Sequence, residues 1–207
     1  VGTCRGTLRV RDALQLSLNI PVVILTEAIT PARLMAHLRR AGVEATLPGG
    51  QPGLAVALGG VGVTLEGLVQ LYAGIANGGR PMPLHSTAGA DRPDLTAPIL
   101  SSESAWQIGN ILSGITPPRR AARTGLAYKT GTSYGHRDAW AIGFDGRHVA
   151  GVWIGRPDGT PVPGAFGAEV SAPILFDAFA LLKPELDRLP PPPPATLIVS
   201  NAQLPQP

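Results

Sequence analysis

Cysteine is almost absent from this sequence of 207 residues. Its single cysteine, Cys4, excludes an internal disulfide and a Cys-x-x-Cys redox or metal pair. The four histidines fall at no spacing typical of metal ligands, so we expect neither a metal site nor a cofactor. No apolar run reaches the roughly 18 residues that a membrane span needs, and the first residues do not resemble a signal peptide. These absences exclude the disulfide-stapled and zinc-ribbon classes of small protein.

Lysine is also scarce, since Lys129 and Lys183 are the only two in the chain. Basic and acidic residues nearly balance, at 17 against 14, and most of the basic residues are arginine. The arginine clusters at residues 39–40 and 119–123 contain no aromatic residues that stack on bases, so we expect no nucleic-acid partner. Hydrophobic residues make up 44% of the chain, which is enough for a globular core.

Helical patterns dominate the first part of the chain. Residues 12–25 predict a helix, a turn and a second helix, with the break at Pro21, because proline disfavours helix in the residue before it. Residues 45–63 and 80–98 read as loops, the first because it is rich in Gly and Pro and the second because its Pro, His, Ser and Asp show no period. Capping residues at the start, among them Thr64 and Ser101 or Ser102, and Gly or Pro at the end predict three further helices, over residues 30–42, 64–78 and 101–113. An apolar run that stops before Pro184 predicts another helix over residues 172–182.

Strand patterns dominate from residue 126 onward, with three β-favouring runs at residues 127–133, 138–146 and 147–157. Asp145-Gly146 predicts a two-residue hairpin between the last two runs. The runs are therefore expected to form an antiparallel meander. The fold class that follows is α/β (α+β type), an antiparallel sheet flanked by helices.

The first of these runs, AYKTGTS, raises the question of whether it carries chemistry. A phosphate-binding loop needs one glycine directly before the lysine and another six residues before it. This sequence has Tyr128 and Arg123 in those places, so that reading fails.

A strand that binds substrate is the other reading. An exposed strand offers backbone groups to an extended peptide, and Gly131 leaves room for its close approach. Thr130 and Thr132 add hydroxyls on either side, and Lys129 adds one positive charge. The combination suits a peptide that ends in a carboxylate, although Lys-Thr-Gly alone also occurs by chance at the start of ordinary strands.

A second motif lies about 110 residues before Lys129, where Ser17-Leu18-Asn19 precedes Pro21. Ser-x-Asn and Lys-Thr-Gly are two of the three motifs of serine acyl-transfer enzymes that recognise penicillin. With SLNIPVV, TLEGLVQLYAGIANGG, AYKTGTSYGHRDAWAIGF, VAGVWIGRPDG and SAPILFDAF in order, the chain resembles the C-terminal part of the transpeptidase domain of class A penicillin-binding proteins. The resemblance implies the penicillin-recognising serine transpeptidase or β-lactamase-like fold, present only in part.

The resemblance also implies roles for the matched residues. Ser17 would relay a proton to or from the leaving amine, and Asn19 would hold the peptide carbonyl of the substrate. Lys129 would give electrostatic support to Ser17 and to the substrate carboxylate. The implied substrate-binding residues are Thr130, Gly131, Thr132 and Ser133. The implied partners are a peptidoglycan stem peptide ending in D-Ala-D-Ala, and β-lactams as inhibitors.

The third motif, Ser-x-x-Lys, is missing, because no serine in the chain has a lysine three residues later. In the family this motif precedes Ser-x-Asn, so we expect the nucleophile on an upstream segment of the same protein, which would be a further partner of this chain. The resemblance places the parent at the periplasmic face of the bacterial inner membrane, with its anchor outside this chain. A D,D-carboxypeptidase, a serine β-lactamase and a non-catalytic binding or scaffolding module remain alternatives.

Two expectations concern the limits of the domain. Residues 1–188 would form the C-terminal part of the transpeptidase domain, and residues 189–207 a proline-rich linker toward a further region. In the family, strands that precede the nucleophile complete the sheet, so the outer edge of residues 147–156 would lack its partner. We expect that edge to be covered by a separate chain, by self-association or by residues 196–200 folding back.

Overall fold

The structure is a computed structural model, and it describes residues 6–87, 95–119, 121 and 125–199. Its centre is an antiparallel sheet of three strands in the order β3 (Ala127–Thr132), β4 (Asp138–Phe144) and β5 (Val149–Gly155). Successive residues of β3 pair with β4 from Ala127↔Phe144 to Thr132↔Ala139. The predicted antiparallel meander and fold class are confirmed.

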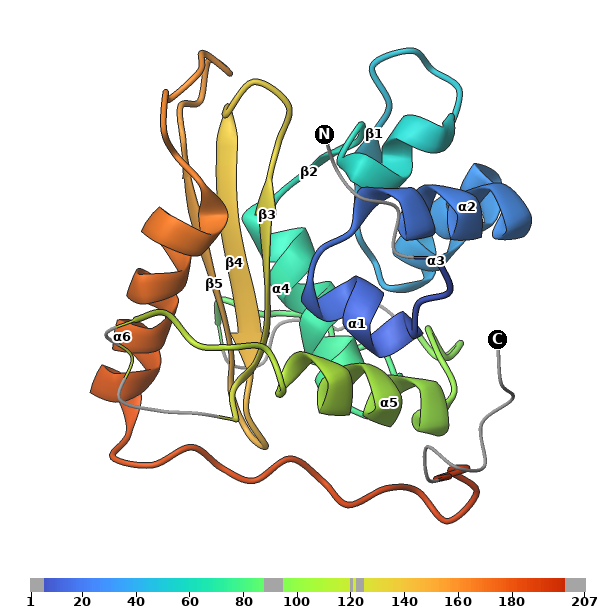
Figure 1. The fold of residues 1–207 in the computed structure, drawn as a ribbon, viewed down its shortest axis with the longest axis vertical. Helices are drawn as coiled ribbons and strands as arrows, with labels where there is room; N and C mark the ends of the chain where they lie inside the picture. Colours follow the sequence, from blue (N-terminus) through green and yellow to red (C-terminus); the bar gives the residue numbers. More distant parts are fainter. Residues whose placement is uncertain (1–5, 88–94, 120, 122–124, 200–207) are drawn as a thin grey trace.

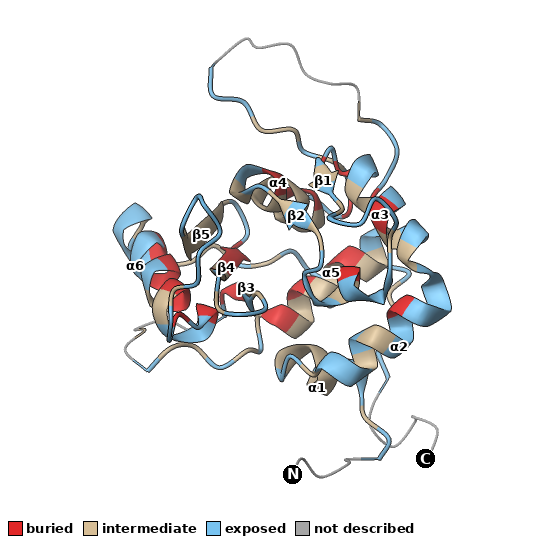
Figure 2. Ribbon diagram, turned by 90° about the horizontal axis from the view of Figure 1, so that it is seen from above, coloured by how far each residue is buried: buried red, intermediate tan, exposed pale blue. Residues whose placement is uncertain are grey.

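Helices cover both faces of this sheet (Figure 1). One face packs against α6 (Ala172–Leu182), which follows a single π-helical turn, η2 (Gly167–Ser171). The other packs against α4 (Leu65–Ala76) and α5 (Ser102–Leu112). Figure 2 shows that the buried residues of α6 gather on the side toward the sheet.

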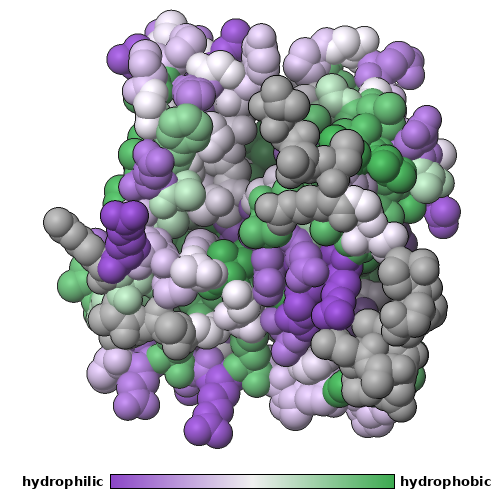
Figure 3. Space-filling view, in the orientation of Figure 1, coloured by the Kyte–Doolittle hydropathy of each residue, from purple (hydrophilic) through white to green (hydrophobic). Residues whose placement is uncertain are grey.

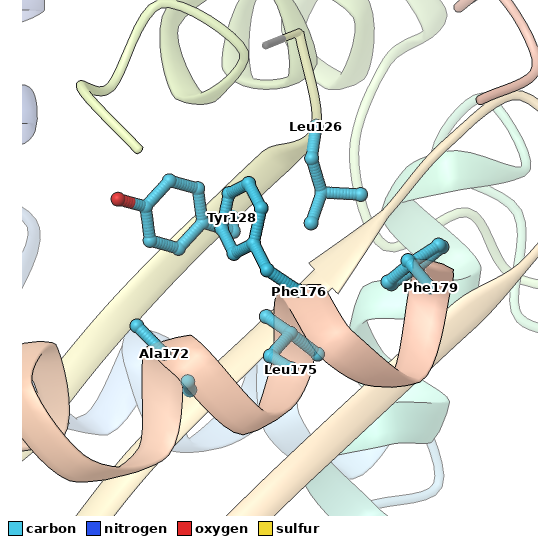
Figure 4. Close-up of a cluster of buried hydrophobic side chains, with 7 residues drawn as sticks. Leu126, Tyr128, Ala172, Leu175, Phe176 and Phe179 are labelled. Carbon is cyan, nitrogen blue, oxygen red and sulfur yellow. The ribbon is translucent and has the colours of Figure 1, made fainter. Parts of the chain in front are cut away.

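The alternation of β3 explains why two cores form. Tyr128 points to the α6 side, where it packs edge-on against Phe176 with ring centroids 5.0 Å apart. The adjacent Ala127 points the other way, into a cluster with Leu112 and Phe144. Figure 4 shows the α6-side cluster, whose buried residues are Leu126, Tyr128, Ala141, Ala172, Leu175, Phe176 and Phe179.

A second part of the chain lies beside the sheet and is mainly helical. It contains α1 (Val10–Gln15), α2 (Asn19–Ile29), α3 (Pro31–Arg40), the short helix η1 (Leu54–Leu58) and a two-stranded ladder of β1 (Ala45–Thr46) and β2 (Gly62–Val63). The sequence predicted only a loop for residues 45–63, because two-residue strands and one 3₁₀ turn are too short to produce a periodic pattern.

The predicted break at Pro21 is wrong. Helix α1 ends at Gln15, and α2 begins at Asn19, so Pro21 lies inside the first turn of α2. Proline is tolerated there because the first backbone N–H groups of a helix have no intrahelical acceptor. The turn lies at residues 16–18 instead.

The predicted two-residue hairpin is also wrong. Phe144 pairs with Val149, so the loop between β4 and β5 has four residues, and Asp145 N donates to His148 O at 3.1 Å. The carboxylate of Asp145 accepts hydrogen bonds from the backbone N–H groups of Arg147 and His148, both at 2.8 Å. This side-chain turn replaces the tight Asp-Gly turn.

Beyond α6 the described chain, to residue 199, forms neither helix nor strand. It runs along the base of the molecule, where Trp106 Nε1 donates to Pro190 O at 3.0 Å (Figure 1). Residues 196–199 lie away from β5, so the predicted fold-back over that edge does not occur in the part of the tail that the structure describes; Ser200 lies outside it. Cover of β5 by another chain or by self-association stays a prediction.

Candidate active site

The turn between α1 and α2 holds Ser17 in a strained backbone conformation. Leu18 N donates to Ala13 O at 3.0 Å and Ser17 N to Leu14 O at 3.2 Å, which closes α1 in the manner usual for a helix-ending glycine. Ser17 takes that place with φ of 53°, in the left-handed region that serine rarely adopts. Strain of this kind concentrates at functional sites, and here it exposes the Ser17 side chain at the turn.

Two contacts to α5 fix the position of this turn. Arg11 donates to the Asn110 side chain at 2.7 Å, and Gln15 Nε2 donates to Ile111 O at 2.7 Å. Helix α5 in turn packs against β3. The turn therefore has a defined position relative to the sheet.

Lys129 lies on β3, and its Nζ donates a hydrogen bond to the hydroxyl of Ser17 in the α1–α2 turn. Nζ also donates to its neighbour Thr130 O at 2.9 Å. Burial lowers the pKa of Lys129, because an apolar environment disfavours the charged amine. The structure thus brings together two of the residues that the sequence identified, although 112 positions separate them.

Asn19 lies two residues after Ser17, at the first position of α2. Its side chain is exposed and makes no hydrogen bond to another residue that the structure describes. The Asn19 amide is therefore free to bind a group from outside these residues.

The four residues after Lys129 form the end of β3 and the start of the next turn. From Ala127 to Thr132, β3 changes from buried to exposed, and it is the outer strand of the sheet beside β4. A Cβ added at Gly131 would lie 3.7 Å from Trp140, an ordinary contact, so packing within the described residues does not require glycine there. The free edge and the missing side chain leave room for an extended ligand beside Thr130 and Gly131.

Hydroxyl groups support this end of the strand. Thr132 Oγ1 accepts from Gly167 N at 3.1 Å, which leaves its own proton available to a ligand. Gly167 itself has to be glycine, because a Cβ there would lie 2.4 Å from Gly131 O. Ser133 Oγ accepts from Asp138 N at 2.9 Å, so it closes the β3–β4 turn, and its predicted role in substrate binding stays a prediction.

One charged cluster escaped the sequence reasoning. Asp145, His148 and Asp187 lie within reach of a single ion at the far end of the sheet. Lys183 Nζ lies 3.4 Å from Asp145 and contacts Asp187 as well, so a lysine supplies positive charge to both carboxylates. The sequence carries no local signal for this cluster, because Lys183 and Asp187 follow the end of α6 at Leu182 and Asp145 lies 42 positions before Asp187. The prediction that the chain binds no metal stays a prediction.

Comparison with known proteins adds independent findings. The family described as "Penicillin binding protein transpeptidase domain" matches residues 2–175. Penicillin-binding protein 1C of Escherichia coli strain K12 is 43% identical over 82% of this chain, and penicillin-binding protein 1B of Vibrio cholerae is 29% identical over 79%. The chain covers 22% and 23% of these two relatives, so it spans less than a quarter of their length.

Solved structures agree with these matches. The structure of PonA1 from Mycobacterium tuberculosis in complex with penicillin V superimposes with a TM-score of 0.71 at 21% identity. The match covers 93% of this chain and 64% of that one. At this identity the likeness shows the fold, and it confirms the predicted fold class.

Proposed function

Because the chain belongs to the penicillin-binding protein transpeptidase family, we propose that it forms the C-terminal part of a serine D,D-transpeptidase that crosslinks peptidoglycan stem peptides. The observation that carries this proposal is the hydrogen bond from Lys129 Nζ to the Ser17 hydroxyl beside an open strand edge. In this proposal residues 1–188 belong to the transpeptidase domain and residues 189–207 form a linker.

The reaction has two steps. A serine hydroxyl outside this chain attacks the carbonyl of the penultimate D-alanine, its proton passes to the leaving amine, and terminal D-alanine departs as an acyl-enzyme ester forms. An amine of a second stem then attacks the ester, and the serine recovers its proton. A β-lactam forms the same ester but carries no leaving group that departs, so it traps the serine.

In these two reaction steps the described residues transfer protons and stabilise charge. Ser17 passes the proton to the leaving nitrogen, and Lys129 keeps the hydroxyl polarised. Asn19 holds the peptide carbonyl of the substrate. Lys129, Thr130 and Thr132 bind its terminal carboxylate, and the N–H of Thr132 supplies one donor to the oxyanion of the tetrahedral intermediate.

The nucleophile is proposed to lie on an upstream segment of the same protein. An exposed apolar surface next to Ser17 supports the proposal, because it offers a site on which that segment can pack. Helix α2 exposes Ile20, Ile24 and Leu25 by 74%, 60% and 51%, although it is a short helix of a globular domain. Leu54 and Leu58 of η1 are exposed as well. Hydrophobic side chains gather over this part of the molecule (Figure 3). Exposed apolar side chains grouped on neighbouring elements are typical of an interaction site, and we assign this surface to the upstream segment.

The proposed location is the periplasmic face of the inner membrane, with the anchor on another part of the protein. Among the described residues no helix has both the length and the hydropathy to cross a membrane. The substrate class supports the location, since stem peptides belong to the cell wall.

Labelling with a fluorescent penicillin tests the proposal in the full-length protein that contains this chain. We expect covalent labelling of the unmodified protein and a loss of roughly a hundredfold in rate in Lys129→Ala, since one charge-stabilising donor contributes about 3 kcal/mol to the transition state. Arg147→Ala is the matched control, because it removes an exposed positive charge from the opposite end of the sheet and leaves the site intact. Equal rates for the unmodified protein and Lys129→Ala would contradict the assigned role. Absence of labelling would favour the non-catalytic module instead.

A further inference from the structure

The turn between β3 and β4 presents one aromatic side chain to solvent. Tyr134 is 94% exposed, and it lies two residues after Thr132. Two hydrogen bonds between Ser133 and Asp138 close the turn. Ser133 N donates to Asp138 O and Asp138 N donates to Ser133 Oγ, both at 2.9 Å. A side chain this exposed adds little to the stability of the chain, and it is free to contact a molecule outside the described residues.

A second loop fixes the turn from its other side. Val162 N donates to His136 O at 2.8 Å, and the His136 ring packs edge-on against Phe166 with centroids 4.5 Å apart. His136 has φ of 55°, a conformation that these contacts hold in place. The turn is therefore a rigid support for Tyr134 rather than a free loop tip.

The exposure of β3 sets the direction of a bound peptide. Ala127 and Tyr128 are 0% and 4% exposed, so an extended ligand has no access to the start of the strand. Gly131 and Thr132 are exposed, and the outer edge of β3 is free beside them. A peptide whose terminal carboxylate lies at Lys129 can therefore extend only toward the β3–β4 turn.

Strand geometry then gives the register. Each residue of an extended peptide advances about 3.3 Å, as does each residue of β3. If the terminal residue lies beside Thr130, the third residue from its end lies beside Thr132 and the next ones beside the turn. Tyr134 follows the end of β3 at Thr132, so its ring starts nearer to these residues than to the terminal pair beside Thr130 and Gly131.

We propose that Tyr134 is a specificity-determining residue that contacts the stem-peptide residues preceding the terminal D-Ala-D-Ala pair. This inference rests on the proposed function of the same site. It predicts that Tyr134 affects long peptides and leaves short substrates unaffected, because short ones end before they reach the ring.

The test uses the full-length protein and two donors that share the same carboxyl end, N-acetyl-D-Ala-D-Ala and a pentapeptide ending in D-Ala-D-Ala. Release of D-alanine is measured for unmodified protein, Tyr134→Ala and Tyr134→Phe. We expect Tyr134→Ala to lower kcat/KM for the pentapeptide about tenfold, as loss of one aromatic contact does, and to leave the dipeptide donor unchanged. Tyr134→Phe keeps the ring and should retain most of the activity toward the pentapeptide.

Labelling by benzylpenicillin shows whether each variant is folded. Leu181→Ala is the control for the loss of an exposed apolar side chain, because Leu181 of α6 is 89% exposed. An unchanged pentapeptide rate in Tyr134→Ala, or an equal loss for both donors, would overturn the inference while the labelled unmodified protein still supports the proposed function. If the unmodified protein is not labelled at all, the proposed function fails and this inference fails with it.

Discussion

The buried carboxylate of Asp145 joins the β4–β5 loop to the chain that follows α6. Its side chain is 1% exposed, and its two oxygens accept from three backbone N–H groups, those of Arg147, His148 and Asp187, at 2.8 to 2.9 Å. Lys183 Nζ lies 3.4 Å from it. Asp145→Ala leaves these three donors without an acceptor, and each buried donor without an acceptor costs roughly 1 to 3 kcal/mol. Because water reaches part of this loop and replaces some of the lost bonds, we predict that the substitution lowers the free energy of unfolding by about 3 to 5 kcal/mol.

Urea and thermal unfolding of the 207-residue chain measure this loss. A change of 1 kcal/mol shifts the melting temperature of a chain of this size by about 2 to 4 °C, so a shift of roughly 6 to 20 °C is expected. Asp158→Ala is the control, since Asp158 is exposed and, among the described residues, its carboxylate accepts hydrogen bonds only from Thr160 of its own loop. An Asp145→Ala variant as stable as Asp158→Ala would contradict this role of the buried carboxylate.

The same carboxylate predicts a dependence on pH. Burial acts to raise the pKa of Asp145, but the three backbone hydrogen bonds and the Lys183 charge outweigh it, so the pKa lies below its ordinary value of 3.8. A depressed pKa contributes stability above the pKa of the unfolded chain, about 3.9, and the contribution is lost as pH falls through the folded value. The difference in stability between the unmodified chain and Asp145→Ala should therefore shrink below about pH 4.

Two further predictions concern acylation. Intact-mass spectrometry of the 207-residue chain after incubation with benzylpenicillin should show no covalent adduct, because no serine has a lysine three residues later, and a stoichiometric mass gain would place the nucleophile inside this chain. In the full-length protein, the rate of penicillin labelling should fall as the pH rises, and this fall should begin below pH 10.5. Burial lowers the pKa of Lys129 from its ordinary value of 10.5, and the neutral amine no longer supplies charge. A rate that stays flat up to pH 10.5 would contradict the role of that charge.

Local signals predicted the elements whose ends are set by their own side chains. Thr64 was predicted as one N-cap and Ser101 or Ser102 as another. In the structure the hydroxyls of Thr64 and Ser101 accept from Gly67 N at 3.0 Å and from Ser104 N at 3.2 Å. The strand containing Lys129 was predicted from residue types alone. These features depend on neighbours within a few positions, which the sequence displays directly.

Features that depend on distant residues could not be predicted. The Asp-Gly pair at 145–146 favoured a tight hairpin, but the loop adopts a wider form in which the Asp145 carboxylate also binds Asp187 N, 42 positions away. In the same way, Pro21 marked a break that lies instead at residues 16–18, where the contact of Gln15 with α5 holds the end of α1. In both places tertiary hydrogen bonds decide between local conformations of similar energy.

The distance between Ser17 and Lys129 depends on a helix that contributes neither residue. Helix α5 binds α1 through Asn110 and Ile111 on one side and packs against β3 on the other. A proton relay between the two side chains needs a hydrogen-bonding separation, and a displacement of about 1 Å in such a pair is enough to cost activity. The alignment of the two motifs is therefore a property of the packing of α5, which explains why neither motif alone could establish the site.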